Sequence, residues 1–282
     1  MTSSSASPDV HAERRAREQG APILSARGVT MRFGGLTAVS GVDLDVYPGE
    51  IMGLIGPNGA GKTTFFNCLT GMYRPTSGEV RLDGIVLPPK PRQVVKAGMA
   101  RTFQNIRLFN NMTALENVMV GRICRTSAGP ITSILHGPKF RREERETRAH
   151  ARELLAYVGL VDSEEHLARN LPYGHQRRLE IARALATGPK LLLLDEPTAG
   201  MNPQETRAAE QLIFRIRDSG LAVLVIEHDM RFIFTLCDRV LCLVRGERLV
   251  EGTPAQVQGD PRVIEAYIGT PDIEGQAQGD DG

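Results

Sequence analysis

A glycine-rich segment at residues 56–64 carries the clearest chemical signal in this sequence. The segment, GPNGAGKTT, matches the pattern G-x-x-x-x-G-K-[ST] at every fixed position, with a β-rich apolar run before it and a helical stretch after it. Glycines let a backbone curl tightly, so successive N–H groups and the N-terminus of the following helix can face one phosphate. Lys62 is then placed to reach the β and γ phosphates of a nucleoside triphosphate, and the Thr63 hydroxyl to ligate Mg²⁺. The predicted phosphate cradle comprises Gly56, Pro57, Asn58, Gly59, Ala60, Gly61, Lys62, Thr63 and Thr64.

The cradle predicts nucleotide binding but does not specify the kind of protein. A chance glycine-rich turn would lack the flanking strand and helix, so we set that alternative aside. GTPases, kinases, helicases and transporters all share the pattern, and other segments must distinguish them.

Two adjacent carboxylates follow the apolar run of residues 191–194, in the segment LLLLDEP. A buried strand with this sequence would deliver Asp195 to its C-terminal edge, where α/β sheets bind ligands, and Asp195 is therefore predicted to join the Mg²⁺ shell. Glu196 is predicted to polarise the attacking water as a general base. The alternative is an ordinary acidic turn after a strand, and the phosphate cradle in the same chain disfavours it.

The elements that must hold these groups alternate between strands and helices. β-type patterns at 23–33 and 40–49 predict an antiparallel β portion, and apolar runs at 50–56, 191–197 and 221–229 predict the buried strands of a mostly parallel sheet. The other predicted elements are helices at 62–71, 114–124, 139–160, 175–187 and 206–220, a strand at 79–84, and a hairpin at 239–252 that turns at Arg245-Gly246.

The pattern predicts a single α/β domain over residues 23–270. Mostly helical periodicity predicts a helical subdomain inserted at about 91–175. The polar ends, 1–22 and 271–282, are predicted to be a disordered arm and tail. A Gly/Pro-punctuated insertion, at about 125–140, has no assigned role.

Composition excludes some classes of protein and leaves others open. The 282 residues carry a formal net charge of +1, which gives no strong field to attract nucleic acid, and we expect no nucleic-acid partner. No run approaches the roughly 18 to 20 apolar residues that span a bilayer. The first residues also lack the apolar region of a secretory signal, so we expect the protein to stay in the cytoplasm.

Two sets of conspicuous residues have a structural interpretation. The cysteines show no CxxC pair and no zinc-type spacing with histidine, so they are predicted to be small buried side chains with reduced thiols. They are Cys68, Cys124, Cys237 and Cys242. A charge run near residue 145 is predicted to be a solvated helix face, because opposite charges stand four residues apart in the pairs Glu144/Arg148 and Arg142/Glu146.

The order of several motifs resembles that of ATP-binding subunits of ABC transporters. Residues 171–186, LPYGHQRRLEIARALA, stand just before LLLLDEP and resemble the family's signature segment, usually LSGGQ followed by an Arg-rich helix. The other matching segments are MRFGG at 31–35, RTFQN at 101–105, TAGMN at 198–202 and IEHD at 226–229. Each is weak alone, but together and in this order they are specific. The resemblance covers about residues 23–269 and implies a P-loop ABC ATPase core with an antiparallel β portion and an inserted helical subdomain.

The resemblance also implies roles for particular residues. Phe33 would stack on adenine, and Gln104 would sense Mg²⁺ and water and touch the membrane subunit. His228 would contact the γ-phosphate, although a lone histidine is more often structural and Phe33 alone would be read as core. The signature residues would serve an ATP held by the opposing ATPase; they are Leu171, Pro172, Tyr173, Gly174 and His175.

Within the family, the sequence is most similar to one of the two ATPases of branched-chain amino-acid importers. The segments RTFQNIRLFNNMTALENVMVGR, LPYGHQRRLEIARALA and EGTPAQVQGDPRVIEAYIG carry this similarity. It implies Mg²⁺-dependent ATP hydrolysis at the cytoplasmic face of the cell membrane, through two permease subunits. It also implies a second, sister ATPase and an extracytoplasmic binding protein. Relatives serve urea, short amides and other solutes, so the transported solute stays open.

One departure and three rival interpretations remain. Pro172, Tyr173 and His175 replace residues of the usual Ser-Gly-Gly-Gln, so the γ-phosphate would lose the signature hydroxyl, and proline supplies no N–H.

The rival interpretations are a non-hydrolysing ATP-binding regulatory subunit, an ABC ATPase acting on ribosomes or DNA, and the ATPase of a lipid or lipopolysaccharide exporter. Glu196 and His228 argue against the first, and the chain length against the second.

Overall fold

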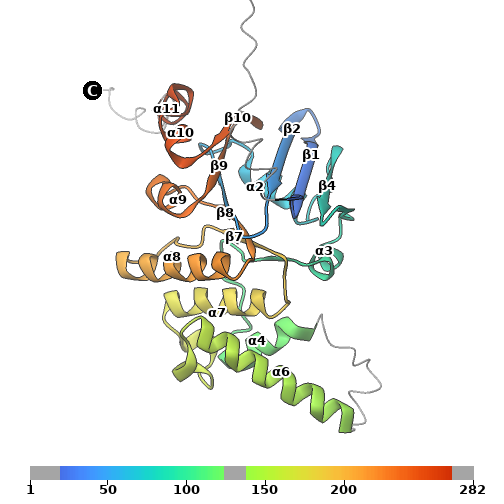
Figure 1. Ribbon diagram of the computed structural model, residues 1–282, viewed down its shortest axis with the longest axis vertical. Helices are drawn as coiled ribbons and strands as arrows, with labels where there is room; N and C mark the ends of the chain where they lie inside the picture. Colours follow the sequence, from blue (N-terminus) through green and yellow to red (C-terminus); the bar gives the residue numbers. More distant parts are fainter. Residues whose placement is uncertain (1–19, 124–137, 269–282) are drawn as a thin grey trace, which may run out of the picture.

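The computed structural model describes residues 20–123 and 138–268, which form two β-sheets and the helices around them (Figure 1). Cys124, the tail 271–282 and most of the arm 1–22 and of the insertion 125–140 lie outside the described residues.

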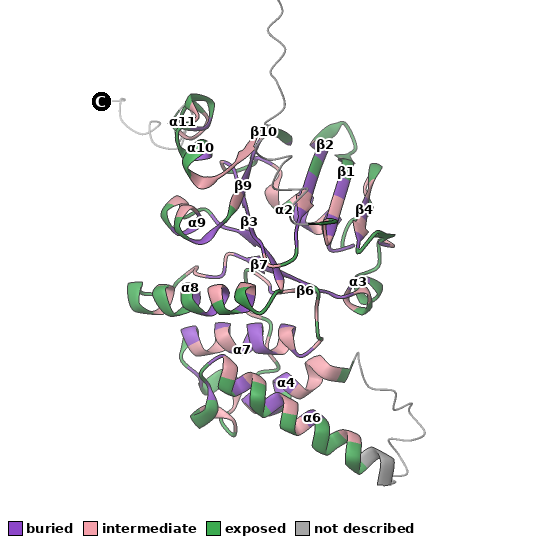
Figure 2. Ribbon diagram, in the orientation of Figure 1, coloured by how far each residue is buried: buried purple, intermediate pink, exposed green. Residues whose placement is uncertain are grey.

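Within the described residues, the larger sheet has six strands in the order β10-β9-β3-β8-β7-β6. All neighbouring pairs are parallel except β9 with β10. The strands are β3 (Ile51–Ile55), β6 (Met99–Arg101), β7 (Leu191–Asp195), β8 (Ala222–Ile226), β9 (Arg239–Val244) and β10 (Glu247–Gly252). Every residue of β3, β7 and β8 is buried, because the central strands are covered on both faces (Figure 2). This burial explains their continuous apolar sequences.

Alternate residues of β7 enter two different hydrophobic cores. Leu192 and Leu194 pack with the helices on one face of the larger sheet, whereas Leu191 and Leu193 face the smaller sheet. This second core also contains Phe65 of helix α2 (Lys62–Leu69). The sheet and α2 are thereby fixed relative to each other, which fixes the loop that joins β3 to α2.

The smaller sheet is antiparallel, as predicted, with the order β2-β1-β4-β5. Its strands are β1 (Leu24–Phe33), β2 (Leu36–Val46), β4 (Ser77–Leu82) and β5 (Ile85–Val86). It lies beside α2 on the upper right in Figure 1.

A helical subdomain forms one end of the molecule, the lower end in Figure 1. It consists of helices α4 (Ala114–Arg122), α6 (Pro138–Tyr157) and α7 (Tyr173–Leu185), which contact one another. A capping box between Thr113 and Glu116 fixes the start of α4. The other α-helices of the described residues are α3 (Pro91–Ala97), α8 (Pro203–Asp218), α9 (Met230–Leu236), α10 (Pro254–Gln258) and α11 (Pro261–Ile268).

The range 91–175 expected for this subdomain contains a strand of the larger sheet. Met99–Arg101 form β6, which pairs with β7 in parallel. A three-residue strand is too short to show an alternating pattern, so its pairing partner alone defines it. Helix α7 also continues to Leu185 while packing on α4 and α6, so the subdomain helices extend past residue 175.

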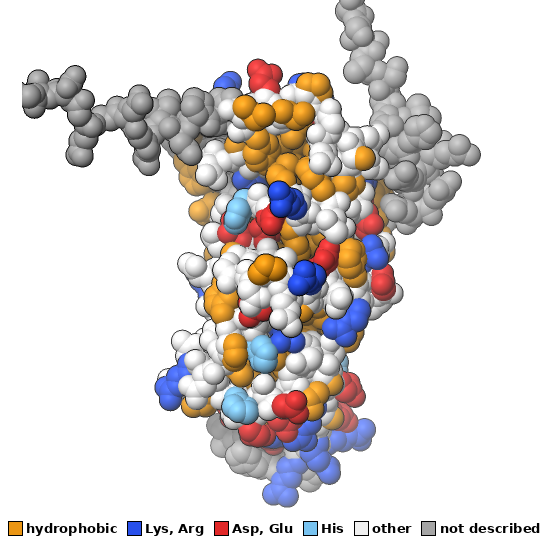
Figure 3. All heavy atoms as spheres, turned by 90° about the vertical axis from the view of Figure 1, so that its left-hand side faces the viewer, with side chains coloured by type: hydrophobic (Ala, Val, Ile, Leu, Met, Phe, Trp, Pro, Cys, Tyr) orange, Lys and Arg blue, Asp and Glu red, His pale blue; other side chains and the backbone are white. Residues whose placement is uncertain are grey.

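The charged helix face is confirmed. Arg142 Nε lies 2.9 Å from Glu146 Oε1, and an Arg148 nitrogen lies 3.8 Å from Glu144 Oε1. Figure 3 shows side chains of both charges gathered at the lower end of the molecule, where the helical subdomain lies.

The described cysteines fit their structural interpretation. Cys68, Cys237 and Cys242 are buried. Burial raises the pKa of the Cys68 and Cys242 thiols to about 11 and also raises that of Cys237, so all three stay protonated near neutral pH. Among the helices of residues 20–123 and 138–268, none is long and apolar enough to cross a bilayer.

Candidate active site

The predicted phosphate cradle is the loop between the end of β3 and the start of α2. Its first and third glycines are required by close backbone contacts. A Cβ on Gly56 would lie 2.2 Å from the Leu243 carbonyl oxygen, and one on Gly61 would lie 2.4 Å from the Ala38 carbonyl oxygen. Gly61 has φ +92°, in the left-handed region that favours glycine. These contacts hold the loop against β9 and β2.

Lys62 folds back over the cradle. Its ammonium donates hydrogen bonds to the carbonyls of Gly56 and Pro57, the second at 3.0 Å. Burial lowers the pKa of Lys62, and the negative charge of Glu196 opposes that shift. A partly desolvated cation in this position gains from an incoming anion such as a triphosphate.

The carboxylate of Asp195 is held by a residue that the sequence interpretation did not single out. Arg101 Nη2 lies 2.9 Å from Asp195 Oδ2, and both side chains are largely buried. Arg101 Nη1 also donates to Asn67 Oδ1 at 2.7 Å, and the guanidinium lies over the Phe66 ring of α2. Burial raises the pKa of Asp195 and the Arg101 charge opposes the rise. Arg101 thus links β6, β7 and α2 beneath the cradle.

Glu196 lies at the meeting point of three segments far apart in the sequence. Gln104 Nε2 donates to Glu196 Oε2 at 2.9 Å, and His228 Nδ1 lies 3.7 Å from Glu196 Oε1. The Glu196 backbone has φ +47°, in the left-handed region, and its N–H donates to the Ile226 carbonyl at 2.9 Å. The structure therefore brings together the three residues predicted to be catalytic.

A second residue outside the predicted set, Glu227, organises this cluster. Its side chain is buried, and Oε1 accepts hydrogen bonds from the Thr198 N–H at 3.0 Å and from the Thr198 hydroxyl. Its other oxygen accepts the His228 N–H at 3.1 Å. Glu227 thereby fixes the histidine segment to the loop after Glu196. Its only signal in the sequence is indirect, a carboxylate at the end of an apolar run.

Phe33 stands at the end of β1 with 43% of its surface exposed, which excludes the core interpretation. Its ring meets the Tyr73 ring edge-on, with centroids 5.5 Å apart and planes at 80°. An exposed aromatic ring braced in this way can offer a face to a planar base.

The predicted signature segment forms the start of α7. Pro172 is the N-cap residue, and Tyr173 is exposed, so this part of the segment faces solvent. Gly174 is buried, and a Cβ there would lie 2.5 Å from Glu205 Oε1. Burial and the charge of Arg178 lower the pKa of His175, so its imidazole is neutral near neutral pH.

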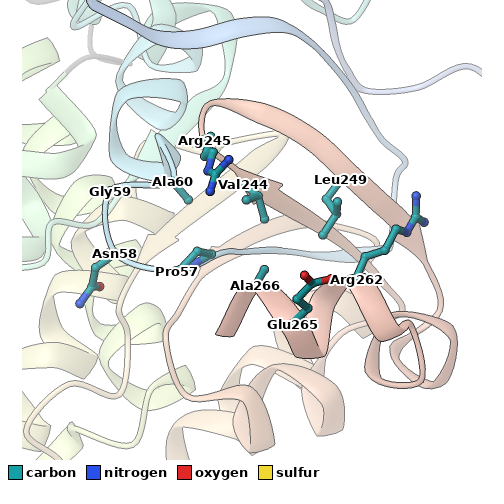
Figure 4. Close-up of a pocket in the computed structure, with 10 residues that line it drawn as sticks. All are labelled: Pro57, Asn58, Gly59, Ala60, Val244, Arg245, Leu249, Arg262, Glu265 and Ala266. Carbon is teal, nitrogen blue, oxygen red and sulfur yellow. The ribbon is translucent and has the colours of Figure 1, made fainter. Parts of the chain in front are cut away.

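A hollow of about 510 Å³ lies on one side of the cradle (Figure 4). Its walls are the cradle, the β9–β10 hairpin and α11; the residues are Pro57, Asn58, Gly59, Ala60, Val244, Arg245, Leu249, Arg262, Glu265 and Ala266. The clustered residues Gln104, Glu196 and His228 are not among the residues that line this hollow. The hairpin braces the cradle here, because the Gly246 N–H donates to the Ala60 carbonyl at 3.0 Å.

The site offers oxygen ligands of the type that Mg²⁺ prefers. Hydroxyl, carboxylate and amide oxygens come from Thr63, Asp195 and Gln104, and Mg²⁺ typically takes only one or two carboxylates besides phosphates and waters. In the described part of the chain, no three His, Cys, Asp or Glu side chains cluster as a metal cage. The donor set therefore fits a metal that arrives with phosphates.

A phosphate cradle before a helix, with carboxylates at the end of another parallel strand of the same sheet, defines a P-loop nucleoside triphosphatase. Comparison with known proteins is more specific. Residues 39–199 match the family described as ABC transporter, and residues 247–273 match the one described as branched-chain amino acid ATP-binding cassette transporter. The chain belongs to the ABC transporter family and is an ATP-hydrolysing P-loop enzyme.

Individual relatives agree with this assignment. The chain is 46% identical over 250 residues to the high-affinity branched-chain amino acid transport ATP-binding proteins LivG of Escherichia coli K12 and BraF of Pseudomonas aeruginosa. Each match covers 88% of this chain and 98% of the relative. Among solved structures, an ATP-binding cassette of an ABC transporter in its ADP conformation superposes with a TM-score of 0.77 at 30% identity, covering 89% of this chain and all of that one. The predicted family and fold are confirmed.

Proposed function

We propose that ATP hydrolysis by this chain powers an importer of branched-chain amino acids, with Glu196 as the general base. The convergence of Gln104, Glu196 and His228 carries the proposal for hydrolysis, since a module that only binds ATP needs none of these contacts. The 46% identity to LivG and BraF and the match at residues 247–273 support the solute.

The chain's own residues divide the work of hydrolysis. Backbone N–H groups of the cradle and Lys62 bind the β and γ phosphates, while the exposed ring of Phe33 stacks on adenine. Glu196 takes a proton from the attacking water, and Gln104 orients its carboxylate through the 2.9 Å hydrogen bond. His228 donates to the γ-phosphate as charge develops there.

Mg²⁺ would be held by Thr63, Gln104 and, through water, Asp195. It would neutralise charge on the phosphate oxygens. The ion pair with Arg101 occupies Asp195 Oδ2 and leaves the other carboxylate oxygen to accept a hydrogen bond from such a water.

The complete enzyme is proposed to be a pair of ATPases on two permease subunits at the cytoplasmic face of the membrane. A dimeric cassette in a post-hydrolysis state with ADP and Pi, 28% identical to this chain with a TM-score of 0.68, supports pairing. Each ATP would lie between one subunit's cradle and the other's signature segment. A sister ATPase and an extracytoplasmic binding protein complete the proposed importer.

The test is to purify the membrane complex through a tag on this chain and reconstitute it in vesicles with ATP inside or outside. ATP-dependent uptake of radiolabelled leucine, isoleucine or valine is expected, and Lys62→Ala in the same complex should abolish it. Uptake of urea or short amides instead would show that branched-chain amino acids are not the transported solute. Outward movement of lipid would contradict import, and ATP binding without hydrolysis would contradict the assigned chemistry.

A further inference from the structure

Helix α7 carries a guanidinium in the interior of the protein. The Arg177 side chain is 1% exposed, and Glu180, one turn along the same helix, is equally buried. Arg177 Nη1 lies 3.1 Å from Glu180 Oε2. Buried charges are costly unless they are paired and their remaining donors and acceptors are used, so the other partners of this pair indicate what holds it in place.

Both Nη nitrogens of Arg177 also reach backbone carbonyls of the candidate active site, while its Nε has no hydrogen-bond partner among the described residues. Nη1 donates to the Phe103 carbonyl at 2.5 Å, and Nη2 donates to the Gln104 carbonyl at 2.6 Å. Nη2 also lies 3.4 Å from the carbonyl of Glu196. One side chain therefore contacts the backbone of both residues that flank the proposed attacking water.

Glu180 supplies a hydrogen-bond acceptor to the same segment. Its Oε1 accepts the N–H groups of Phe103 and Arg107, both at 3.3 Å. Residues 102–109 form neither helix nor strand, so their backbone groups need partners from elsewhere. The pair supplies donors to the carbonyls and an acceptor to the amides of this one segment.

We propose that Arg177 and Glu180 act as a positioning pair that fixes the backbone of Gln104 and Glu196 for hydrolysis. The inference rests on the proposed roles of those two residues. Within this chain, triphosphate binding depends on the cradle and Phe33, which belong to other elements, whereas the signature residues at the start of α7 are proposed to serve the partner's ATP. Loss of the pair should therefore lower kcat and leave KM for ATP unchanged.

Two variants of the complete complex test this. Arg177→Met with Glu180→Gln removes both charges together and keeps an amide oxygen that can accept the two N–H groups. Arg177→Lys keeps the charge pair but replaces the two-nitrogen fork, which contacts the Phe103 and Gln104 carbonyls, with a single ammonium on a differently shaped side chain. In each, kcat should fall about tenfold or more, since small misplacement of catalytic groups costs up to about a hundredfold, with KM within about twofold of the parent.

The control is Arg152→Met with Glu164→Gln, the same substitutions at an Arg–Glu pair that is more exposed. This Arg–Glu pair lies in the same subdomain, with contacts of 3.0 and 3.2 Å, and its described contacts do not include active-site residues. It should leave kcat and KM unchanged.

Three results would overturn the inference. They are unchanged kcat in folded positioning variants, a rise in KM that accounts for the whole loss, and loss of the cooperative unfolding transition in both variants, which would make the pair a folding determinant. Absence of ATP hydrolysis by the parent complex would instead refute the proposed function.

Discussion

Glu196 holds its carboxylate on a backbone conformation that few non-glycine residues adopt. Its φ of +47° falls in the left-handed region, which costs a side-chain-bearing residue about 1–3 kcal/mol in a sparsely populated conformation. The hydrogen bonds to Gln104 and Ile226 offset this cost. Such strain persists where surrounding contacts determine the geometry. At this residue the result is a carboxylate that lies between Gln104 and His228.

Glu196→Gln should bind ATP normally and hydrolyse it slowly, because the amide keeps the shape and cannot accept the proton. Loss of a general base typically costs about 10² to 10⁴ in rate. Single-turnover hydrolysis in the assembled complex measures this. A rate within about threefold of the parent would assign Glu196 a structural part.

Phe33→Ala should weaken ATP binding by about 1–3 kcal/mol if the ring stacks on the base. It should also reduce discrimination between ATP and GTP, since the proposed contact of Phe33 is with the base and not with the phosphates. Competition binding with ATP and GTP tests whether the ring stacks on the base. If the competition profile is unaltered, the exposed ring has another purpose.

At the scale of elements, a buried carboxylate joins the start of β3 to β9. Glu50 Oε2 accepts the Tyr47 N–H at 2.8 Å, and Oε1 lies 3.0 Å from an Arg239 nitrogen. Burial raises the pKa of Glu50 from 4.5 to about 7, with Arg239 opposing the rise. A raised carboxyl pKa means that the folded protein binds more protons than the unfolded chain between these two values. Stability therefore falls as pH rises through that window and levels off above it.

Glu50→Gln should remove this part of the pH dependence. Between about pH 5 and pH 8, the parent should lose about 2 kcal/mol of unfolding free energy relative to the variant, since one pKa unit corresponds to about 1.4 kcal/mol. Denaturant titrations of both proteins at the two pH values give this difference, and other titrating groups cancel. Parallel pH profiles would contradict the assignment to Glu50.

At the scale of the whole molecule, the signature segment and the cradle of one chain are proposed to serve different ATP molecules. Pro172, Tyr173 and His175 should then weaken the composite site built on the partner's cradle. The site built on Lys62 and Glu196 should depend instead on the partner's signature. This asymmetry follows from pairing and not from the chemistry of either segment alone.

Restoring the usual signature tests the pairing. Pro172→Ser with Tyr173→Gly and His175→Gln offers the γ-phosphate a hydroxyl and extra backbone N–H groups, and one such donor is worth about 10² or more in rate. Disabling one general base at a time in the heterodimer isolates each site. Restoration should speed the site on the partner's cradle, and a faster site at Glu196 would show that the proposed pairing is wrong.

The features that could be predicted from the sequence depend on residues that are neighbours in the chain. The glycines before Lys62, the apolar run before Asp195 and the hairpin turn at Arg245 are local patterns, because tight turns, buried strands and helix starts depend on adjacent residues. They predicted the cradle, the buried strand that ends at Asp195 and the hairpin, whereas the family was implied by the resemblance of several motifs in order.

The tertiary structure alone decided which distant groups hold the site. Arg101 and Asp195 are 94 positions apart, and Arg177 contacts Gln104 from 73 positions away. No local pattern marks such partners, since any arginine can pair with any carboxylate until the fold brings two of them together. The three-residue strand β6 is of the same kind: its hydrogen bonds to β7 exist only in the assembled sheet, and they carry Arg101 to Asp195.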